Sequence, residues 1–138
     1  MVTRWIPAGT SGVGIAETSA QANVVTQETT TSTSYVDLAT AGPSVTLSPG
    51  STQNHLIWIK CEMSTSAAGP CDVNVSIAGG AAVDGEGAKA VSAASLIPAA
   101  QVYYAAAVVN GSTHTMKYKN DAGNTSTYRN RRIVATTT

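Results

Sequence analysis

The two histidines are the first residues to consider for catalysis. His55 and His114 are the only imidazoles in the chain. A histidine that acts as a general base needs a nucleophile beside it and a carboxylate that orients its ring. Neither histidine has a serine, cysteine or carboxylate at a spacing that marks such a triad, and each begins a predicted strand after a turn. We interpret both as solvated side chains at strand ends and expect no catalysis from them.

The carboxylates could support acid and base catalysis if two of them faced each other. A glycosidase holds such a pair about 5 to 9.5 Å apart. The acids are scattered along this chain instead, at Asp37, Glu62, Asp72, Asp84, Glu86 and Asp121. We interpret them as solvated acids in loops. The nearby glycines form no phosphate-binding loop, because no Gly-Lys-Ser/Thr follows them, so we expect no cofactor.

The two cysteines, Cys61 and Cys71, are ten positions apart on strands that we expect to pair. A disulfide between them would close a loop of about eleven residues and would contribute roughly 2.8 kcal/mol on the chain-entropy estimate. Synthesis in the cytoplasm favours buried free thiols instead. A metal site is not expected, because no cluster of cysteine and histidine completes four ligands. Free thiols and a Cys61–Cys71 disulfide both remain open.

The densest positive patch lies near the end of the chain, at Arg129, Arg131 and Arg132. Strand alternation predicts that Arg129 and Arg131 share one face, and that Arg132 lies with Tyr128 on the other. Arginine is the usual choice for ion pairs in interfaces and interiors. We expect a carboxylate such as Glu28 or Asp37 to pair with this patch, within the chain or across subunits. Arg129 and Arg131 are therefore candidates for both fold stabilisation and partner binding.

Composition limits the classes of partner. The chain has 138 residues, eight basic and eight acidic, and only 12% of the residues are charged. Nucleic-acid binding is not expected, since affinity for phosphates depends on clustered lysine and arginine. A membrane span is not expected either, because no window reaches 18 apolar residues. The first residues lack the apolar run of a signal peptide, so we expect a soluble chain made in the cytoplasm. The low charge predicts self-association, since little repulsion opposes it.

The pattern beyond residue 22 is that of short strands separated by turns. Threonine, valine and tyrosine alternate with polar residues, and turn pairs such as Gly42-Pro43, Pro49-Gly50 and Asn110-Gly111 interrupt them. We predict two hairpins, one joining 56–63 to 71–77 and one at Asn110-Gly111. Alternation along the first hairpin predicts two core-facing sets of side chains, Ile57, Ile59, Cys61 and Met63 on one strand and Cys71, Val73, Val75 and Ile77 on the other. The predicted strands are 23–31, 34–40, 44–48, 56–63, 71–77, 89–97, 101–110, 113–120 and 127–136. This predicts an all-β domain over residues 23–138, an antiparallel β-sandwich that is jelly-roll-like.

The first 22 residues have a different composition and are predicted to form an extended N-terminal arm, with a disordered tail as the alternative. Three glycines punctuate this segment, and Pro7 opposes a helix around it. Fully extended, about 20 residues reach some 65 Å. Burial of a tryptophan is worth roughly 4 to 6 kcal/mol. We therefore expect Arg4, Trp5, Ile6 and Pro7 to bind a partner.

Four stretches carry a family resemblance. They are 28–38 (ETTTSTSYVDL), 42–47 (GPSVTL), 71–79 (CDVNVSIAG) and 128–134 (YRNRRIV). Together they resemble small β-sandwich structural proteins of tailed bacteriophages, which serve as capsid decoration (cement) or tail-associated proteins. The resemblance spans about residues 24–136. It implies a virion component, often trimeric, with no enzymatic site.

Two roles follow from this resemblance. The first is a capsid decoration protein on the virion surface, which binds the major capsid protein and stabilises the head through its arm and sandwich. The single compact domain and the arm of small residues favour this role, because an arm that reaches a neighbouring subunit adds multivalent attachment. The alternative is a tail or fibre component that takes part in binding a host receptor. An unrelated sugar-binding module is a further alternative, and an enzyme is not expected.

Overall fold

Every regular element of the described chain is a β-strand. The structure is a computed structural model, and it describes residues 18–138 except 68, 83–84 and 92–94. The strands are β1 (Ser19–Val24), β2 (Glu28–Thr30), β3 (Ser44–Thr46), β4 (Gln53–Thr65), β5 (Cys71–Ser76), β6 (Ala88–Ala90), β7 (Ile97–Val108), β8 (Thr113–Asn120) and β9 (Ser126–Thr137). Among these residues, none belongs to a helix long and apolar enough to span a membrane.

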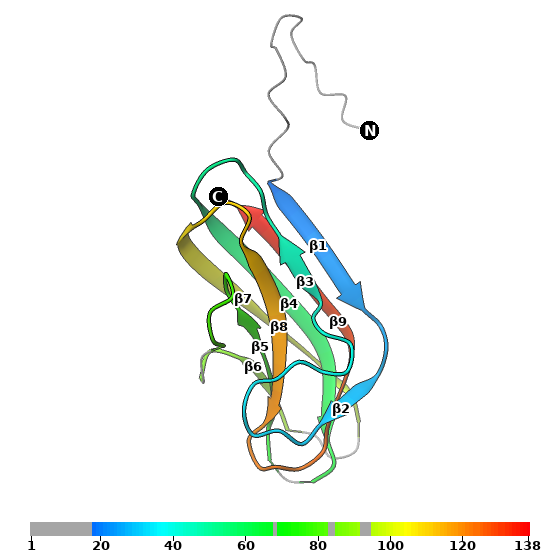
Figure 1. Ribbon diagram of the computed structural model, residues 1–138. Helices are drawn as coiled ribbons and strands as arrows, with labels where there is room; N and C mark the ends of the chain where they lie inside the picture. The colour runs from blue at the N-terminus through cyan, green and yellow to red at the C-terminus, as the bar shows by residue number, and fades with distance from the viewer. Residues whose placement is uncertain (1–17, 68, 83–84, 92–94) are drawn as a thin grey trace, which may run out of the picture.

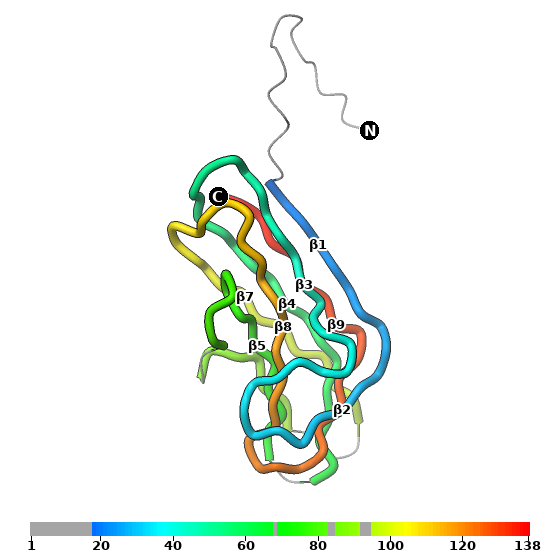
Figure 2. The backbone as a smooth tube through the Cα atoms, viewed as in Figure 1, coloured from blue at the N-terminus to red at the C-terminus, as the bar shows by residue number. Residues whose placement is uncertain are grey.

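The strands form two antiparallel sheets that face each other (Figure 1). Sheet A has the order β1-β9-β4-β7, with β2 also paired to β9, and sheet B has the order β3-β8-β5-β6. From β3 onward the chain passes to the opposite sheet at each connection except the one from β5 to β6, as the backbone trace shows (Figure 2). This is the arrangement of a jelly roll. The predicted fold class is confirmed.

The two predicted hairpins are wrong. Strands β4 and β5 belong to different sheets, and so do β7 and β8 on either side of Asn110-Gly111. A turn signal reports only that the chain reverses, and in a sandwich a reversed strand can join either layer. The predicted strand at 34–40 is absent as well, because only an isolated bridge joins Val36 to Tyr118.

Strand β7 is present as predicted, but it begins earlier than predicted. The alanine-rich stretch 101–108 is a strand, as predicted, but it begins at Ile97 and includes Pro98, which we had placed at a junction. Proline lacks a backbone donor and is tolerated on edge strands, and β7 is an edge of sheet A. The predicted strand 89–97 is reduced to the three residues of β6 before residues 92–94, which lie outside the description.

The core lies between the two sheets and follows the predicted alternation. The inward side chains of β4 and β5 are buried as expected, with Ile57, Cys61 and Val73 fully enclosed. Ile77 is partly buried and packs against this core. The remaining core side chains come mainly from β7, β8 and β9, and include Tyr103, Met116, Tyr118, Tyr128 and Ile133.

A β-bulge at Asn130 overturns the predicted faces of the arginines. The register of β4 and β9 shifts between Lys60, opposite Arg132, and Glu62, opposite Arg129. Asn130 takes a positive φ of 49° there, and the left-handed region is one of the conformations that bulges use. Arg131 consequently points inward and is fully buried, whereas Arg129 and Arg132 are exposed.

The buried guanidinium of Arg131 joins β9 to β2 and to the segment before β3. Its Nη2 lies 2.6 Å from Oε2 of Glu28, and its Nη1 donates to the carbonyls of Thr40 (3.2 Å) and Gly42 (3.3 Å). It also lies over the ring of Tyr118, 5.4 Å from the centroid. The predicted partner Glu28 is therefore confirmed. The assignment of Arg131 to a partner-binding surface is corrected, because no part of it reaches solvent.

The boundary between arm and domain also differs from the prediction. Strand β1 begins at Ser19 and pairs with β9 from Ser19–Thr136 to Val24–Arg131. Residues 19–22, which we had assigned to the arm, therefore belong to sheet A. The predicted partner-binding residues Arg4, Trp5, Ile6 and Pro7 lie outside the described residues.

Substitution of Arg131 by alanine should destabilise the fold strongly. It removes the guanidinium that binds Glu28 and the carbonyl of Thr40, whereas the carbonyl of Gly42 keeps the hydroxyl of Tyr118 as a donor. Breaking a buried pair costs about 3 to 5 kcal/mol. The free energy of unfolding in urea measures this. Arg129→Ala is the matched control, because its pair with Glu62 is exposed and should cost at most about 1 kcal/mol. Equal losses from both substitutions would contradict this account.

Candidate partner-binding surface

The outer face of sheet A carries an apolar stripe. Opposed residues of paired antiparallel strands point to the same side of a sheet. One row joins Leu56 to Tyr104, and the next joins Val134, Trp58 and Val102 across three strands. Ala100 lies in the row after that, opposite Lys60. We define the apolar stripe as Leu56, Trp58, Ala100, Val102, Tyr104 and Val134.

The stripe is open to solvent at its centre and along its edge. Trp58 is 38% exposed, Val102 51% and Tyr104 61%. Within the described chain, β7 pairs with β4 alone, so its other edge has no strand beside it. A long edge strand with apolar outward side chains is a surface that favours association with another chain.

Two shallow pockets adjoin the stripe and share Lys60 and Arg132. One has a volume of about 470 Å³ and is lined mainly by Trp58, Ala100, Val102 and Val134. The other has about 510 Å³ and is lined by polar residues of β1, β4 and β9, which include Gln21, Asn23, Glu62 and Asn130. The outer face is therefore apolar toward β7 and polar toward β1.

One ion pair and two further polar side chains, Asn130 and Arg132, border the stripe on its polar side. Arg129 Nε lies 2.7 Å from Oε2 of Glu62, and Asn130 donates to the same oxygen at 3.0 Å. These hydrogen bonds lower the pKa of Glu62. Arg132 donates to the side chain of Gln21. An apolar centre with a polar rim is the usual anatomy of a protein interface.

Of the predicted site residues, only Arg129 reaches this surface within the described chain. The central side chains, Trp58, Val102 and Tyr104, were missed by the sequence analysis. The sequence signal that could have identified them is an excess of apolar residues on both faces of the strand that became β7. Strand β7 places Val102 and Tyr104 outward and Tyr103 and Ala105 inward. A strand with only one buried face would carry polar residues on the other.

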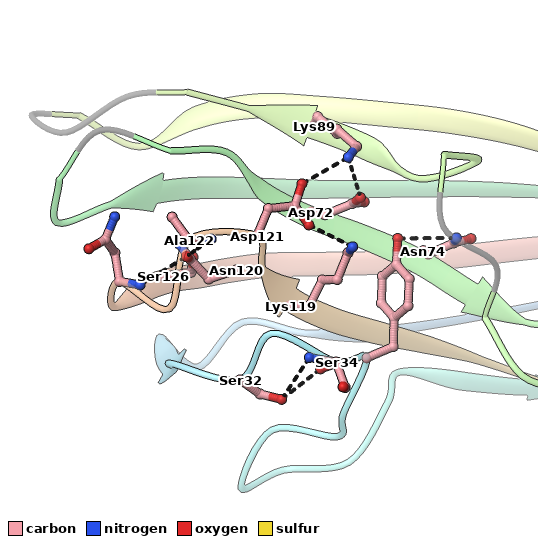
Figure 3. A network of polar contacts seen from close by, with 12 residues as sticks. Ser32, Ser34, Asp72, Asn74, Lys89, Lys119, Asn120, Asp121, Ala122 and Ser126 are labelled. Atoms are coloured by element: carbon pink, nitrogen blue, oxygen red, sulfur yellow. Dashed lines mark hydrogen bonds and ion pairs between the residues drawn. The ribbon is translucent and has the colours of Figure 1, made fainter.

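Sheet B holds its polar groups in an internal network (Figure 3). Lys89 Nζ lies 3.4 Å from Asp72 Oδ2 and 2.9 Å from Asp121 Oδ2, and Lys119 Nζ lies 2.6 Å from Asp121 Oδ1. The interpretation of Asp72 as a solvated loop acid is wrong. It lies on β5, is fully buried, and packs so closely on Gly87 that a Cβ there would fall 1.8 Å from its Oδ1. Burial raises the pKa of Asp72.

The charged groups of this network pair with one another and so stabilise the fold. Both carboxylates are matched by lysine, and Lys119 also lies 5.0 Å from the ring centroid of Tyr35. The described residues contain no group of three or more side chains that could hold a metal ion. Beside the network is a polar pocket of about 590 Å³, lined by Thr33, Ser34, Tyr35, Ser76, Gly79, Gly80, Ala81, Ala82 and Lys117.

The two histidines form a buried pair, which corrects their interpretation as solvated side chains. His55 Nδ1 and His114 Nε2 are 2.8 Å apart, and both rings are fully enclosed. The backbone N–H of Ala78 donates to His114 Nδ1 at 3.2 Å. His114 Nε2 therefore carries the proton and donates to His55. Burial lowers the pKa of both rings, that of His114 to about 4 with a smaller contribution from His55.

The cysteines are free thiols in this structure, and both are buried. Cys61 donates to the carbonyls of Glu62 (3.3 Å) and Arg129 (3.6 Å), and Cys71 to that of Ala90 (3.3 Å). Burial raises the pKa of Cys61 to about 12 and that of Cys71 to about 11. Because the thiolate is the reactive form, neither thiol is suited to act as a nucleophile.

Comparison with known proteins shows the fold. No family model and no curated protein matches the chain. It is similar to a chain in the structure of infectious bursal disease virus, Gx strain, with 12% identity over 96% of this chain and 36% of the viral chain, at a TM-score of 0.50. The globular domain of zebrafish complement 1qA gives 7% identity, coverage of 87% and 94%, and a TM-score of 0.49.

A carbohydrate-binding domain is similar over a smaller part of this chain. The CBM22-1 xylan-binding domain of Paenibacillus barcinonensis Xyn10C gives 13% identity, coverage of 70% of this chain and 65% of that one, and a TM-score of 0.42. The chain therefore spans just over a third of the viral chain's length and about two thirds of the xylan-binding domain's. At these identities the likeness concerns the β-sandwich alone.

The histidine pair predicts that the fold loses stability in mild acid. The unfolded histidines titrate near pH 6.5, whereas the folded pKa of His114 is about 4. Stability is therefore complete above pH 6.5 and falls as the pH drops below it, since the unfolded state binds more protons. At pH 5 the loss from His114 alone is about 2 kcal/mol.

Urea unfolding between pH 8 and pH 5 measures this loss. Asp72→Asn is the control, because burial raises the pKa of Asp72. Protonation of Asp72 in acid therefore increases stability, whereas protonation of the histidines decreases it. A free energy of unfolding that stays constant from pH 7 to pH 5 would show that the histidines are not enclosed as described.

Proposed function

We propose that the chain is a non-enzymatic structural protein of a phage virion, a decoration (cement) protein that binds the major capsid protein on the capsid surface. In this proposal sheet A supplies the contact face and the N-terminal arm supplies a second attachment. The protein is made in the host cytoplasm and assembles as a homo-oligomer, a trimer in keeping with the phage proteins it resembles.

The apolar stripe is the observation that carries the proposal. Trp58 and Tyr104 are aromatic side chains of the kind that anchor protein interfaces, and both stand on paired strands of sheet A. Their exposure has no role in folding the isolated domain, since the core lies on the other face of sheet A. A contact face for a protein partner accounts for it. The occurrence of the same fold in a virus structure supports the proposed class.

The chemistry of the described side chains also favours a structural role. The histidines hydrogen bond to each other, the thiols are buried with raised pKa values, and Asp72 and Asp121 are held by lysines. These groups act within the fold. The apolar stripe, with the ion pair of Arg129 and Glu62 at its rim, takes no part in these contacts and suits binding.

A tail or fibre component that binds a host receptor is the second candidate. The polar pocket on sheet B favours it, because its hydroxyl groups and the ring of Tyr35 are of the kind that bind sugars. Lys117 at this pocket already pairs with Asp37 at 2.7 Å. The two candidates place the contact on opposite sheets, so substitutions on each sheet separate them.

Binding to expanded heads of the virus that encodes the chain tests the proposal. The wild-type chain should bind purified heads at a fixed stoichiometry and raise their melting temperature in calorimetry. Val102→Glu, which places a charge in the centre of the stripe, should weaken binding by at least about tenfold. Val91→Glu is the matched control, since Val91 is similarly exposed but follows β6 of sheet B.

Three other outcomes would contradict the proposal, in its role or in its contact face. Heads that neither bind the chain nor gain stability would exclude it. Equal losses from Val102→Glu and Val91→Glu would exclude sheet A as the contact face. Binding to host cells that Tyr35→Ala abolishes, without binding to heads, would establish the receptor-binding alternative.

A further inference from the structure

The apolar stripe has no cover within the described chain. Three of the six large hydrophobic side chains that the structure leaves exposed, Trp58, Val102 and Tyr104, belong to it. Water contact with such a surface is unfavourable, so a segment that can reach the stripe gains free energy by covering it.

The chain enters sheet A beside the stripe. The carbonyl of Thr18 accepts hydrogen bonds from the backbone N–H of Thr137 (2.8 Å) and from Oγ1 of Thr136 (2.9 Å). The next residue, Ser19, begins the row that passes through Thr136 and Leu56 to Tyr104. The described chain therefore begins in register with the first row of the stripe.

The length of the segment before Thr18 matches the distance it has to cover. From Ser19 to Val102 there are three strand spacings and a step of two residues, about 16 Å in all. Ten residues, 8–17, separate Pro7 from Thr18, and they include three glycines. A chain of that length and composition has a root-mean-square span of about 17 Å. The effective concentration of a tethered group is highest when the tether matches the span, on the order of millimolar.

The chemistry of residues 4–7 also fits the stripe. Trp5 and Ile6 are apolar, and Arg4 has the exposed rings of Trp58 and Tyr104 to lie over, an arrangement favoured by cation–π attraction. We infer that, in the free chain, Arg4-Trp5-Ile6-Pro7 lies on the apolar stripe of its own sheet A. The same segment is then held in place before assembly and is released when the stripe meets its partner.

This inference concerns the isolated protein and depends on the stripe alone. A chain that fails to bind heads could still cover its stripe with its own arm. A chain that binds heads could do so with an arm that never touches the stripe. The two experiments therefore fail separately.

Tryptophan fluorescence tests the inference, because Trp5 and Trp58 are the only tryptophans. Trp58→Tyr keeps an aromatic ring in the stripe and makes Trp5 the sole reporter. Its acrylamide quenching constant should be at least about threefold below that of a synthetic peptide of residues 1–17, because a docked indole is shielded from solvent. Adding Val102→Glu should restore the peptide value, whereas adding Val91→Glu should not.

Dilution of the protein shows whether the stripe is covered by the chain's own arm or by the arm of a second copy. Protection of Trp5 by its own chain is unchanged over an approximately hundredfold range of protein concentration, since the tether fixes the effective concentration. Protection that disappears on dilution, together with a loss of oligomers in light scattering, would assign the arm to a second copy and overturn the inference. Quenching equal to that of the free peptide at all concentrations would also overturn it.

A deletion provides a second readout that does not require a stripe substitution. Removal of residues 2–7 leaves Trp58 as the only tryptophan in an intact sheet A. Its emission should shift to the red, and its quenching should rise by about twofold or more, because the covering segment is gone. Unchanged emission and quenching of Trp58 would contradict the inference.

Discussion

The β-bulge at Asn130 is the constraint on which the two faces of sheet A depend. Strand β9 pairs with β1, β2 and β4, so a change in its alternation affects most of the sheet. The extra residue turns Arg131 into the interior, where it binds Glu28, and leaves Arg129 and Arg132 on the outer face beside Glu62 and Lys60. The same bulge therefore provides the buried ion pair of the fold and the charged border of the apolar stripe.

The two sheets differ in how they use their outer faces. Sheet B covers its polar side chains with its own loops, so that Asp72 and Asn74 are buried on the side away from the core. Sheet A leaves Trp58, Val102 and Tyr104 uncovered. A jelly roll needs only the inner faces to close its core, so an apolar outer face is additional to folding. That asymmetry is the basis for a function carried out by contact with other proteins.

The sequence was sufficient for properties that depend on local pattern. Alternation identified the inward residues of β4, and β-branched residues identified β7 as a strand despite its alanines. The sequence was insufficient for properties that depend on which strands pair in the folded protein. Turn residues after Met63 and at Asn110-Gly111 mark reversals but not the sheet that the next strand joins. Strict alternation does not allow for the extra residue of the bulge, so it assigned Arg131 to the wrong face. The burial of His55 and His114 depends on residues brought together from opposite sheets.

The central claim is that the outer face of sheet A makes the protein's contact with its partner. A reconstruction of the intact virion at side-chain resolution tests it most directly. The account predicts that Trp58, Val102 and Tyr104 lie against another protein chain, with Arg129 and Glu62 at the rim of that contact. A particle in which the chain is present with these three side chains facing solvent, and sheet B against the shell, would contradict it.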